Sequence, residues 1–432
     1  MPSSSSTLRY VYTQLTSEDD GRVCRDIPES ACHHQPRNFL LHILSLAGTK
    51  TADGLLSPKI VLAWLITALG APAALVGFLV PVREAGSLLP QLFVAARIRS
   101  LPQRKWVWSL GSLVQGLCVA GMAVTAVTME GGIAGWLIIG LLAVLALARS
   151  LCSISYKDVL GKTVSKATRG TATGSASTIA ASAVLLFGLA LFAELVPRTP
   201  TTIAAVLLVA AGLWITAAAL FTLLLEESGA TQGGGNPVRL AISQCSMLWQ
   251  DRQLAWFVTT RGLLLATALA PPFMLTLGSP GQIEQLGGFI VAGAAAALLS
   301  AYAWGRLADR SSRRVLIYAA LLGCLALAGA ALATTAGFTS DWLIALLFFV
   351  LMIAYEGVRL GRATHIVDMA SADNRAAYTA VSNTTIGVLL LLGGGFSLVA
   401  ASMGSVAVIA CFAVMCALAA ATATRLTEVQ SA

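Results

Sequence analysis

Residues 305–314, Gly305-Arg306-Leu307-Ala308-Asp309-Arg310-Ser311-Ser312-Arg313-Arg314, separate two long apolar runs at about 284–304 and 315–336. Each run is long enough to cross a bilayer as a helix, which takes about 20 residues. The pattern therefore predicts a tight, charged loop where the chain leaves the membrane and turns back. Its four arginines favour the cytoplasmic side, because short loops rich in Lys and Arg are retained there.

The composition is that of an integral membrane protein. The 432 residues are 57% hydrophobic and only 11% charged, with a mean hydropathy of +0.79. Soluble domains carry about 25% charged residues, so this chain has too few to cover a water-facing surface. The net charge of +8 is spread in small groups between apolar runs. That is typical of loops beside anionic lipid, so the bilayer is an expected partner and nucleic acid is not.

The apolar runs predict an all-α polytopic membrane protein with about twelve transmembrane helices. The first run contains Pro58 and is longer than one crossing needs, so we expect it to be bent or tilted or to start outside the hydrocarbon. The expected spans are 39–68, 75–96, 106–128, 133–155, 173–196, 201–225, 254–277, 285–304, 315–336, 341–362, 376–399 and 402–424.

The loop charges predict that both chain ends are cytoplasmic, since an even number of spans puts them on one side. Alternate loops hold nearly all the basic residues, and the remaining loops hold few. The basic set is Arg97, Arg99, Arg104, Lys105, Lys157, Lys162, Lys166, Arg169, Arg306, Arg310, Arg313, Arg314 and Arg375. Residues 1–37 and 426–432 are expected to be cytoplasmic tails, the first of them flexible. Residues 226–253 form a linker, for which an amphipathic surface helix and a plain connection are both open.

Residues 305–314 also resemble the signature loop of the major facilitator superfamily, Gly-x-Leu-Ala-Asp-Arg-x-Gly-Arg-Arg/Lys. The alternative is a basic turn that obeys only the topology rule. Ser312 replaces the second Gly of the signature. The matching positions are Gly305, Leu307, Ala308, Asp309, Arg310, Arg313 and Arg314.

The resemblance implies two pseudo-symmetric six-helix bundles, at 38–225 and 254–425. A weak internal repeat agrees with this, as in transporters built from parallel repeats. Residues 96–105 occupy the place in the first half that 305–314 have in the second, but Ser100 stands where the Asp belongs. The resemblance is therefore strong in the second half and degenerate in the first.

Four ionisable residues lie inside the first two apolar runs. Lys50 and Asp53 are three residues apart and share one face of the first helix, while Arg83 and Glu84 are adjacent in the second. A charge at the bilayer centre costs at least about 2.5–3.5 kcal/mol, so it usually faces a partner or a wet cavity. We expect the four to form one polar cluster that serves binding or coupling. The alternative is a set of structural ion pairs.

The second half carries a smaller group of charges at membrane depth. Glu356 and Arg359 follow helical spacing in the tenth span, and Arg261 lies in the seventh, where it can pair with Glu356. Arg149, Arg359 and Arg362 have a simpler interpretation, in which their side chains extend to the lipid headgroups.

The resemblance also implies a conformational gate at the signature loop. Asp309 would cap the start of the eleventh helix, near Arg375, and Arg310 or Arg306 would pair with Asp368. The gating candidates are Gly305, Asp309, Arg310, Arg313, Arg314 and Asp368.

The function implied by the resemblance is secondary active transport of a small solute by alternating access. Protonation of Asp53, Glu84 or Glu356 would couple it to a proton gradient. The fifth span lacks the Gly-Pro pattern of the family's drug/proton antiporters, which counts against drug export. The alternative is a membrane sensor or assembly protein that keeps the fold without the flux. No enzyme motif or phosphate-binding loop occurs, so no enzymatic activity and no cofactor are expected.

Cysteine spacing predicts no disulfide framework and no metal site. Cys24, Cys32, His33 and His34 lie close together but match no known zinc spacing, and an unstructured tail is the favoured interpretation. We expect a monomer in the cell membrane, of the bacterial inner-membrane type.

Overall fold

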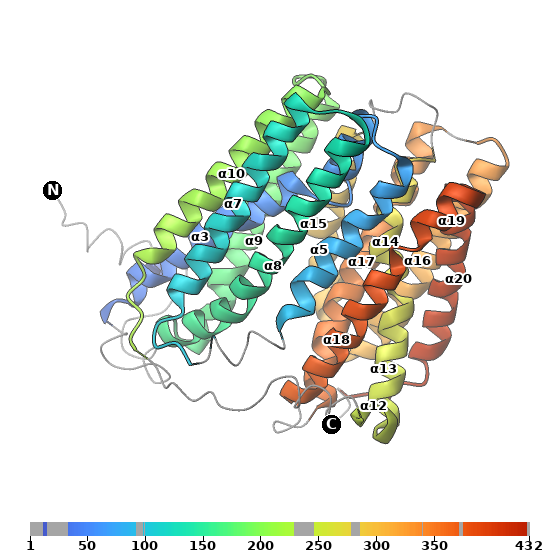
Figure 1. Ribbon diagram of the computed structural model, residues 1–432. Coiled ribbons are helices and arrows are strands. Elements are labelled where there is room, and N and C mark those ends of the chain that lie inside the picture. Colours follow the sequence, from blue (N-terminus) through green and yellow to red (C-terminus); the bar gives the residue numbers. More distant parts are fainter. Residues whose placement is uncertain are drawn as a thin grey trace.

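The computed structural model describes residues 12–14, 33–91, 98, 100–228, 246–277, 286–338, 340–370 and 375–429. Within these ranges the regular structure is helical throughout, and ten helices are long and apolar enough to cross a membrane. The predicted all-α polytopic membrane fold is confirmed. Figure 1 shows the helices running roughly side by side.

The helices alternate in direction between the two ends of the molecule. In the first half they are α3 (Gln35–Leu56), α4 (Val61–Ala68), the 3₁₀ helix η2 (Ala73–Phe78), α5 (Leu79–Leu88), α7 (Lys105–Thr128), α8 (Gly131–Thr163), α9 (Lys166–Phe192) and α10 (Pro200–Thr222). In the second half they are α12 (Met247–Gln250), α13 (Arg252–Leu263), α14 (Leu265–Met274), α15 (Leu286–Arg310), α16 (Ser312–Thr335), α17 (Asp341–Met369), α18 (Arg375–Gly393), α19 (Phe396–Met403) and α20 (Ser405–Ala423).

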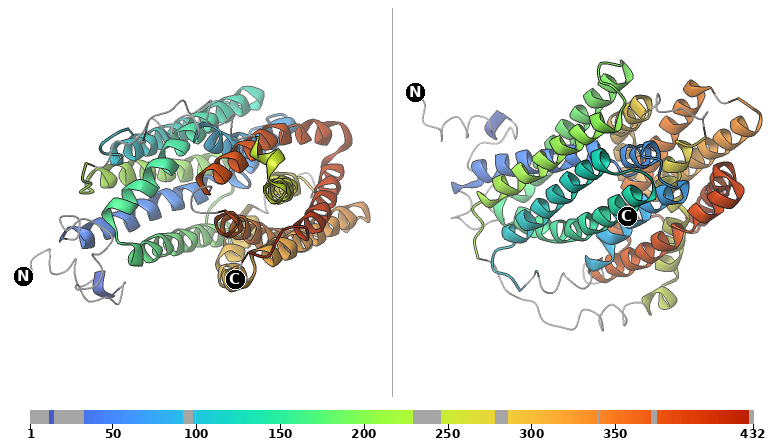
Figure 2. Two further views of the ribbon diagram at one scale, coloured as in Figure 1. Left: turned by 90° about the horizontal axis from the view of Figure 1, so that it is seen from below. Right: turned by 45° about the horizontal axis from the view of Figure 1, so that its top comes forward.

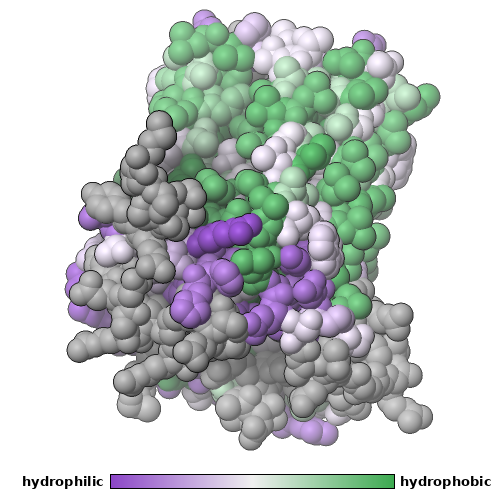
Figure 3. All heavy atoms as spheres, turned by 90° about the vertical axis from the view of Figure 1, so that its left-hand side faces the viewer, coloured by the Kyte–Doolittle hydropathy of each residue, from purple (hydrophilic) through white to green (hydrophobic). Residues whose placement is uncertain are grey.

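We call the end that holds Arg104, Lys162 and Arg310 the basic end, and the end that holds Glu130 and Glu194 the opposite end. Figure 3 shows hydrophilic side chains gathered toward the basic end, low in the view, with hydrophobic surface above them. Large apolar side chains are exposed along the helices, among them Trp136 at 61%. Since water would not tolerate so much apolar surface, this belt is the face that meets lipid.

The first two expected spans are broken into shorter pieces. The run at 39–68 forms α3 and α4 with a turn at Ser57–Ile60, so the bend expected from Pro58 is confirmed. Proline has no N–H to donate and disfavours a helical residue before it. The second span begins as η2 after Pro72 and continues as α5. The polar content of α3 and the short length of α5 leave both outside the ten apolar helices.

The expected loop at 305–314 is mostly helical, which corrects the prediction. Helix α15 continues to Arg310 and α16 begins at Ser312, so the turn is confined to Ser311. Ser311 is the N-cap of α16, and its hydroxyl accepts the N–H of Arg314 at 3.1 Å. Ala308 is 2% exposed. An apolar residue on the buried face and a serine cap thus extend both helices past the membrane surface.

Two further spans are interrupted. The seventh is α13 and α14 with a break at Leu264, and the eleventh continues through Gly394 and Gly395 into α19, beyond the expected end at 399. Gly394 lies close to the first half, because a Cβ there would lie 3.0 Å from the Phe78 ring and would force that ring to shift. The amphipathic helix expected after Gly235 falls mainly on 229–245, outside the described residues, as do Cys24 and Cys32 and most of the expected tail.

Two described parts of the expected tail and linker pack on the first half. Tyr12 is 3% exposed, lies edge-on to Phe39 at 5.1 Å between ring centroids, and accepts a hydrogen bond from Gln35 Nε2 at 2.7 Å. Glu226, which we had expected to open the linker, is 5% exposed. Both residues therefore belong structurally to the first helix bundle.

The blue-to-green first half and the yellow-to-red second half lie on two sides of the molecule (Figures 1 and 2). They meet along α9 with α15 and along α5 with α18. Contact is tight toward the opposite end, where a Cβ on Gly287 of α15 would lie 2.4 Å from the Phe192 nitrogen of α9. Likewise, a Cβ on Gly77 would lie 1.9 Å from Ser397 Oγ. The two halves are therefore closed against each other at that end.

Candidate functional site

Asp53 is the centre of a charged group at mid-membrane. Its Oδ1 lies 2.8 Å from Arg83 Nη2 and its Oδ2 lies 2.6 Å from Arg149 Nη1. The three side chains come from α3, α5 and α8 and are between 12% and 31% exposed. One carboxylate thus joins three helices of the first half. Arg149 does not extend to the headgroups, as the simpler interpretation had it, because Asp53 binds its guanidinium.

The other two residues of the expected cluster have separate surroundings. Lys50 Nζ donates a hydrogen bond to Ser177 Oγ of α9, and its charge interacts with those of Arg359, Arg149 and Asp53. Glu84 forms no ion pair with the described residues and lies within electrostatic range of Arg261. Lys50 and Glu84 therefore lie within electrostatic range of one second-half charge each, Arg359 and Arg261.

A polar cavity of about 230 Å³ adjoins this group inside the first half. It lies between α3, α7, α8 and α9 and includes residues near the basic end of the last two helices, such as Lys157 and Thr173. The polar residues that line it nearer the middle are Lys50, Ser112, Gln115, Arg149, Cys152 and Tyr156.

The second half places its charges differently from the prediction. Arg261 Nη1 donates to Ser382 Oγ at 2.7 Å, and Glu356 Oε2 lies 2.7 Å from Arg359 Nη2. The predicted Arg261–Glu356 pair is therefore wrong. Arg359 lies one helical turn from Glu356 and can pair with it at less conformational cost than a residue on another helix.

Lys59 provides a further contact between the halves. Its Nζ lies 3.2 Å from the centroid of the Tyr355 ring, which belongs to α17. A cation over an aromatic face is attracted by the ring quadrupole. The bend after α3 is thus attached to the helix that carries Glu356 and Arg359.

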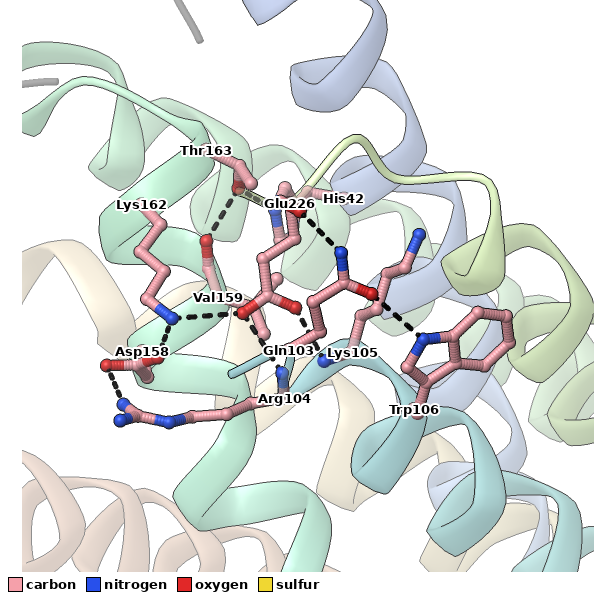
Figure 4. Close-up of polar contacts among 10 residues, drawn as sticks. All are labelled: His42, Gln103, Arg104, Lys105, Trp106, Asp158, Val159, Lys162, Thr163 and Glu226. Atoms are coloured by element: carbon pink, nitrogen blue, oxygen red, sulfur yellow. Dashed lines mark hydrogen bonds and ion pairs between the residues drawn. The ribbon is translucent and has the colours of Figure 1, made fainter. Parts of the chain in front are cut away.

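Glu226 organises the basic end of the first half (Figure 4). Its buried carboxylate accepts the backbone N–H of Arg104 at 3.0 Å and of Lys105 at 2.8 Å, and lies 3.2 Å from Lys162 Nζ. Lys162 also pairs with Asp158, which pairs with the Arg104 side chain. The carboxylate caps α7, where a negative charge complements the helix dipole. This network occupies the place of the degenerate first-half loop.

At the basic end of the second half, the contacts run to the end of the chain. Glu428 Oε2 accepts the Ser311 hydroxyl at 2.6 Å and lies 3.8 Å from Arg313 Nε. Arg313 also donates to the Leu426 carbonyl at 3.1 Å. The residues after α20 therefore hold the turn between α15 and α16.

The gating contacts implied by the resemblance are not formed as expected. Arg306 donates to Tyr302 of its own helix at 3.1 Å. Asp309 and Arg310 are exposed and form no ion pair with the described residues, and no ion pair joins Arg306 or Arg310 to Asp368 in this conformation. The pairing is expected in the state whose cytoplasmic side is closed, so it stays a prediction. The expected cap of Asp309 on α18 involves side chains at 371–377, which lie outside those described.

Sequence reasoning missed Arg149, Gln115 and Glu226 as site residues. Ser112 and Gln115 are polar, three residues apart and inside an apolar run, a signal like the one that identified Lys50 and Asp53. Glu226 gave no such signal, because it lies beyond the end of an apolar run among other charged residues.

The sequence pattern of the Major Facilitator Superfamily matches residues 39–394. Together with the paired helix bundles, this match shows that the chain belongs to that superfamily and is a transmembrane transporter. No curated protein sequence matches the chain.

Solved structures of transporters share the fold at low sequence identity. A mutant of the nucleoside transporter NupG is 14% identical, with a TM-score of 0.70 over 90% of this chain and 100% of that one. A POT family transporter in complex with 5-aminolevulinic acid is 8% identical, with a TM-score of 0.67 over 89% and 95%. The inward-open xylose transporter XylE from E. coli is 11% identical, with a TM-score of 0.64 over 91% and 97%.

Proposed function

We propose that this transporter is a secondary active one, which carries a small solute by alternating access and binds it beside the Asp53 group. The observation that supports this most directly is the ion-paired group of Asp53, Arg83 and Arg149 next to a polar cavity at mid-membrane. Charges at this depth are costly and mark solute or ion pathways. Two helix bundles around a midplane site suit rocking of one half against the other.

The contacts between the halves support an inward-facing state. The opposite end is closed at Gly287 and Gly77, while the cavity extends toward the basic end at Lys157 and Thr173. The excess of Lys and Arg at the basic end favours the cytoplasm there. We therefore propose that the solute enters this cavity from the cytoplasm and that both chain ends are cytoplasmic. A monomer of the bacterial inner-membrane type fits this arrangement.

The basic end provides candidate gating contacts in both halves. Glu226 caps α7 in the first half, and Glu428 holds Ser311 and Arg313 in the second. Gly305, Asp309, Arg310, Arg314 and Asp368 remain candidates for contacts made when this end closes. The exposure of Asp309 and Arg310 in the inward-facing state agrees with that role.

Glu84 is the strongest candidate for proton coupling. Asp53 is bound by two arginines and Glu356 by Arg359, whereas Glu84 forms no ion pair with the described residues. A solved D-xylose-proton symporter has a similar fold. We propose that Glu84 exchanges a proton during the cycle, with Asp53 and Glu356 as alternatives.

Solute flux into proteoliposomes tests the function. A panel of labelled neutral, cationic and anionic solutes is offered with and without a pH gradient, and at least one solute should accumulate. The Glu84→Gln variant should exchange solute across the membrane but no longer respond to the gradient, with exposed Glu130→Gln as the matched control. Absence of flux for every solute, together with specific binding of a partner protein, would favour the sensor or assembly alternative.

A further inference from the structure

We infer that the solute is a small organic anion that also carries a hydroxyl or N–H group, held between Lys50 and Arg149 in the cavity of the first half. This inference rests on the proposed function and names the substrate class of the same site. It is argued from the charge balance, the cavity lining, the unpartnered polar atoms and the size of the cavity.

The charges around Asp53 do not balance. Three cations, Lys50, Arg83 and Arg149, surround one carboxylate, and the two arginines already share that carboxylate. The hydrogen bond of Lys50 goes to the neutral Ser177 hydroxyl. In the second half Glu356 is bound by Arg359, so it does not compensate Lys50. An uncompensated charge at this depth is unfavourable, and a bound anion would remove the imbalance.

The charged residues that line the cavity are also positive. Lys50, Arg149 and the exposed Lys157 line it, and no Asp or Glu is among its described lining residues. Asp53, which pairs with Arg149, is not among the lining residues. Guanidinium and ammonium groups at one cavity bind carboxylate or phosphate oxygens with short, charge-assisted hydrogen bonds.

Two buried polar atoms of this lining lack a partner. Gln115 is 1% exposed, and its Nε2 donates to the Gly111 carbonyl at 3.2 Å and to Cys152 Sγ at 3.3 Å. These donations orient the amide and leave Gln115 Oε1 as a buried acceptor without a donor. The Tyr156 hydroxyl is also buried without a partner. A buried acceptor left unpaired is costly, so a ligand hydroxyl or N–H would complete the site.

The volume limits the size of the ligand. The cavity measures about 230 Å³, below the usual range of about 300–1,000 Å³ for ligand sites. A short-chain acid or a small phosphate ester fits this volume, and a nucleotide does not. Carboxylates and phosphates share the chemistry that Lys50 and Arg149 recognise, so the experiment offers both.

The experiment uses the full chain in proteoliposomes and matched probes. Lactate is compared with propionate, which lacks the hydroxyl, and with lactamide, which lacks the charge. Glycerol 3-phosphate is compared with glycerol, and inorganic phosphate is included alone. Each compound is assayed for labelled uptake and for competition with every solute that is carried. Competition by at least one hydroxylated anion, about tenfold stronger than by its neutral partner, is the expected result.

Variants locate the binding. Lys50→Gln should weaken anion competition about tenfold while Lys50→Arg retains it, because the charge and not the side-chain length is needed. Gln115→Met, which keeps the volume, should abolish the preference for lactate over propionate or for glycerol 3-phosphate over phosphate. The exposed Arg425→Gln is the control and should leave competition unchanged.

The outcomes separate this inference from the proposed function. Flux of a neutral or cationic solute that no anion inhibits would overturn the inference and leave the transport function intact. Anion competition that Lys50→Gln does not alter would also overturn it. Absence of flux for all solutes, with no anion binding measured by thermal stability, would overturn both.

Discussion

Asp53 of α3 and Arg149 of α8 form an ion pair of 2.6 Å at mid-membrane, and the same carboxylate binds Arg83 of α5. This arrangement accounts for the charged residues Asp53, Arg83 and Arg149 in the interior of α3, α5 and α8. It also fixes the bent first helix against α8 and against α5, which packs on α18 of the second half.

Loss of Asp53 should therefore destabilise the protein more than loss of Arg149. Asp53→Asn leaves two guanidinium groups uncompensated, and Arg149→Gln leaves one carboxylate with Arg83 alone. In a double-mutant cycle of thermal stability in detergent, we expect a coupling energy of about 1–3 kcal/mol. Additive effects of the two substitutions would contradict the pairing.

Glu226 should contribute strongly to the stability of the protein through its contacts at the basic end of the first half. Its side chain is 0% exposed and accepts two backbone N–H groups beside Lys162. Glu226→Gln places an amide NH₂ against donors, and we expect a loss of about 3 kcal/mol in unfolding free energy. Chemical denaturation in detergent measures this, with exposed Glu130→Gln as the control. Equal stability of the two variants would show that the cap is dispensable.

Gly287 should control closure of the opposite end. A Cβ there would lie 2.4 Å from the Phe192 backbone nitrogen, whereas on the adjacent Gly288 it would meet only Phe192 Cδ2 at 3.9 Å. Overpacking costs about 1–3 kcal/mol, or about tenfold in a conformational equilibrium. We expect Gly287→Ala to reduce flux by about tenfold and Gly288→Ala to have little effect. Similar flux in both variants would mean that this contact does not gate the cycle.

Acid should weaken the start of α13, outside the membrane. Burial alone raises the pKa of Asp251, but hydrogen bonds from Tyr378 and from the N–H groups of Leu254 and Gln253 outweigh it, so the pKa lies below its ordinary value. A lowered pKa in the folded state stabilises the protein above the unfolded pKa of about 4, and the stability is lost as pH falls through the folded value.

Tyr378→Phe should therefore lower the melting temperature at pH 7, and the difference from the wild type should shrink as the pH falls below the unfolded pKa of Asp251 and through its lowered folded pKa. Melting curves across this range, with exposed Tyr318→Phe as the control, test the interaction. A difference that is constant with pH would show that the phenol stabilises by packing and not through the Asp251 charge.

The sequence predicted the helical segments well because apolar runs of bilayer length have few alternatives. It predicted less well where tertiary contacts decide. Residues 305–310 continue α15 with Ala308 on a buried face, and the Gly394–Gly395 turn between α18 and α19 packs on the Phe78 ring of the first half. Neither contact can be inferred from local composition.

The candidate site was predictable in its charges but not in their pairing. Lys50, Asp53, Arg83 and Glu84 were conspicuous because ionisable residues are rare in apolar runs. Their partners depend on helix packing, so Arg149 replaced Glu84 beside Asp53, and Ser382 replaced Glu356 beside Arg261. Gln115 and Glu226 acquire their importance only from burial.

The most direct test of alternating access measures distances between the two halves at both ends of the molecule. In a cysteine-free background, spin labels are placed at Gly170 and Arg310 for the basic end, and at Leu195 and Phe338 for the opposite end, all of them exposed. With a transported solute, pulsed electron resonance should show the first distance shortening as the second lengthens. If each label pair showed one distance that did not change on addition of a transported solute, under conditions of active flux, the account would be contradicted.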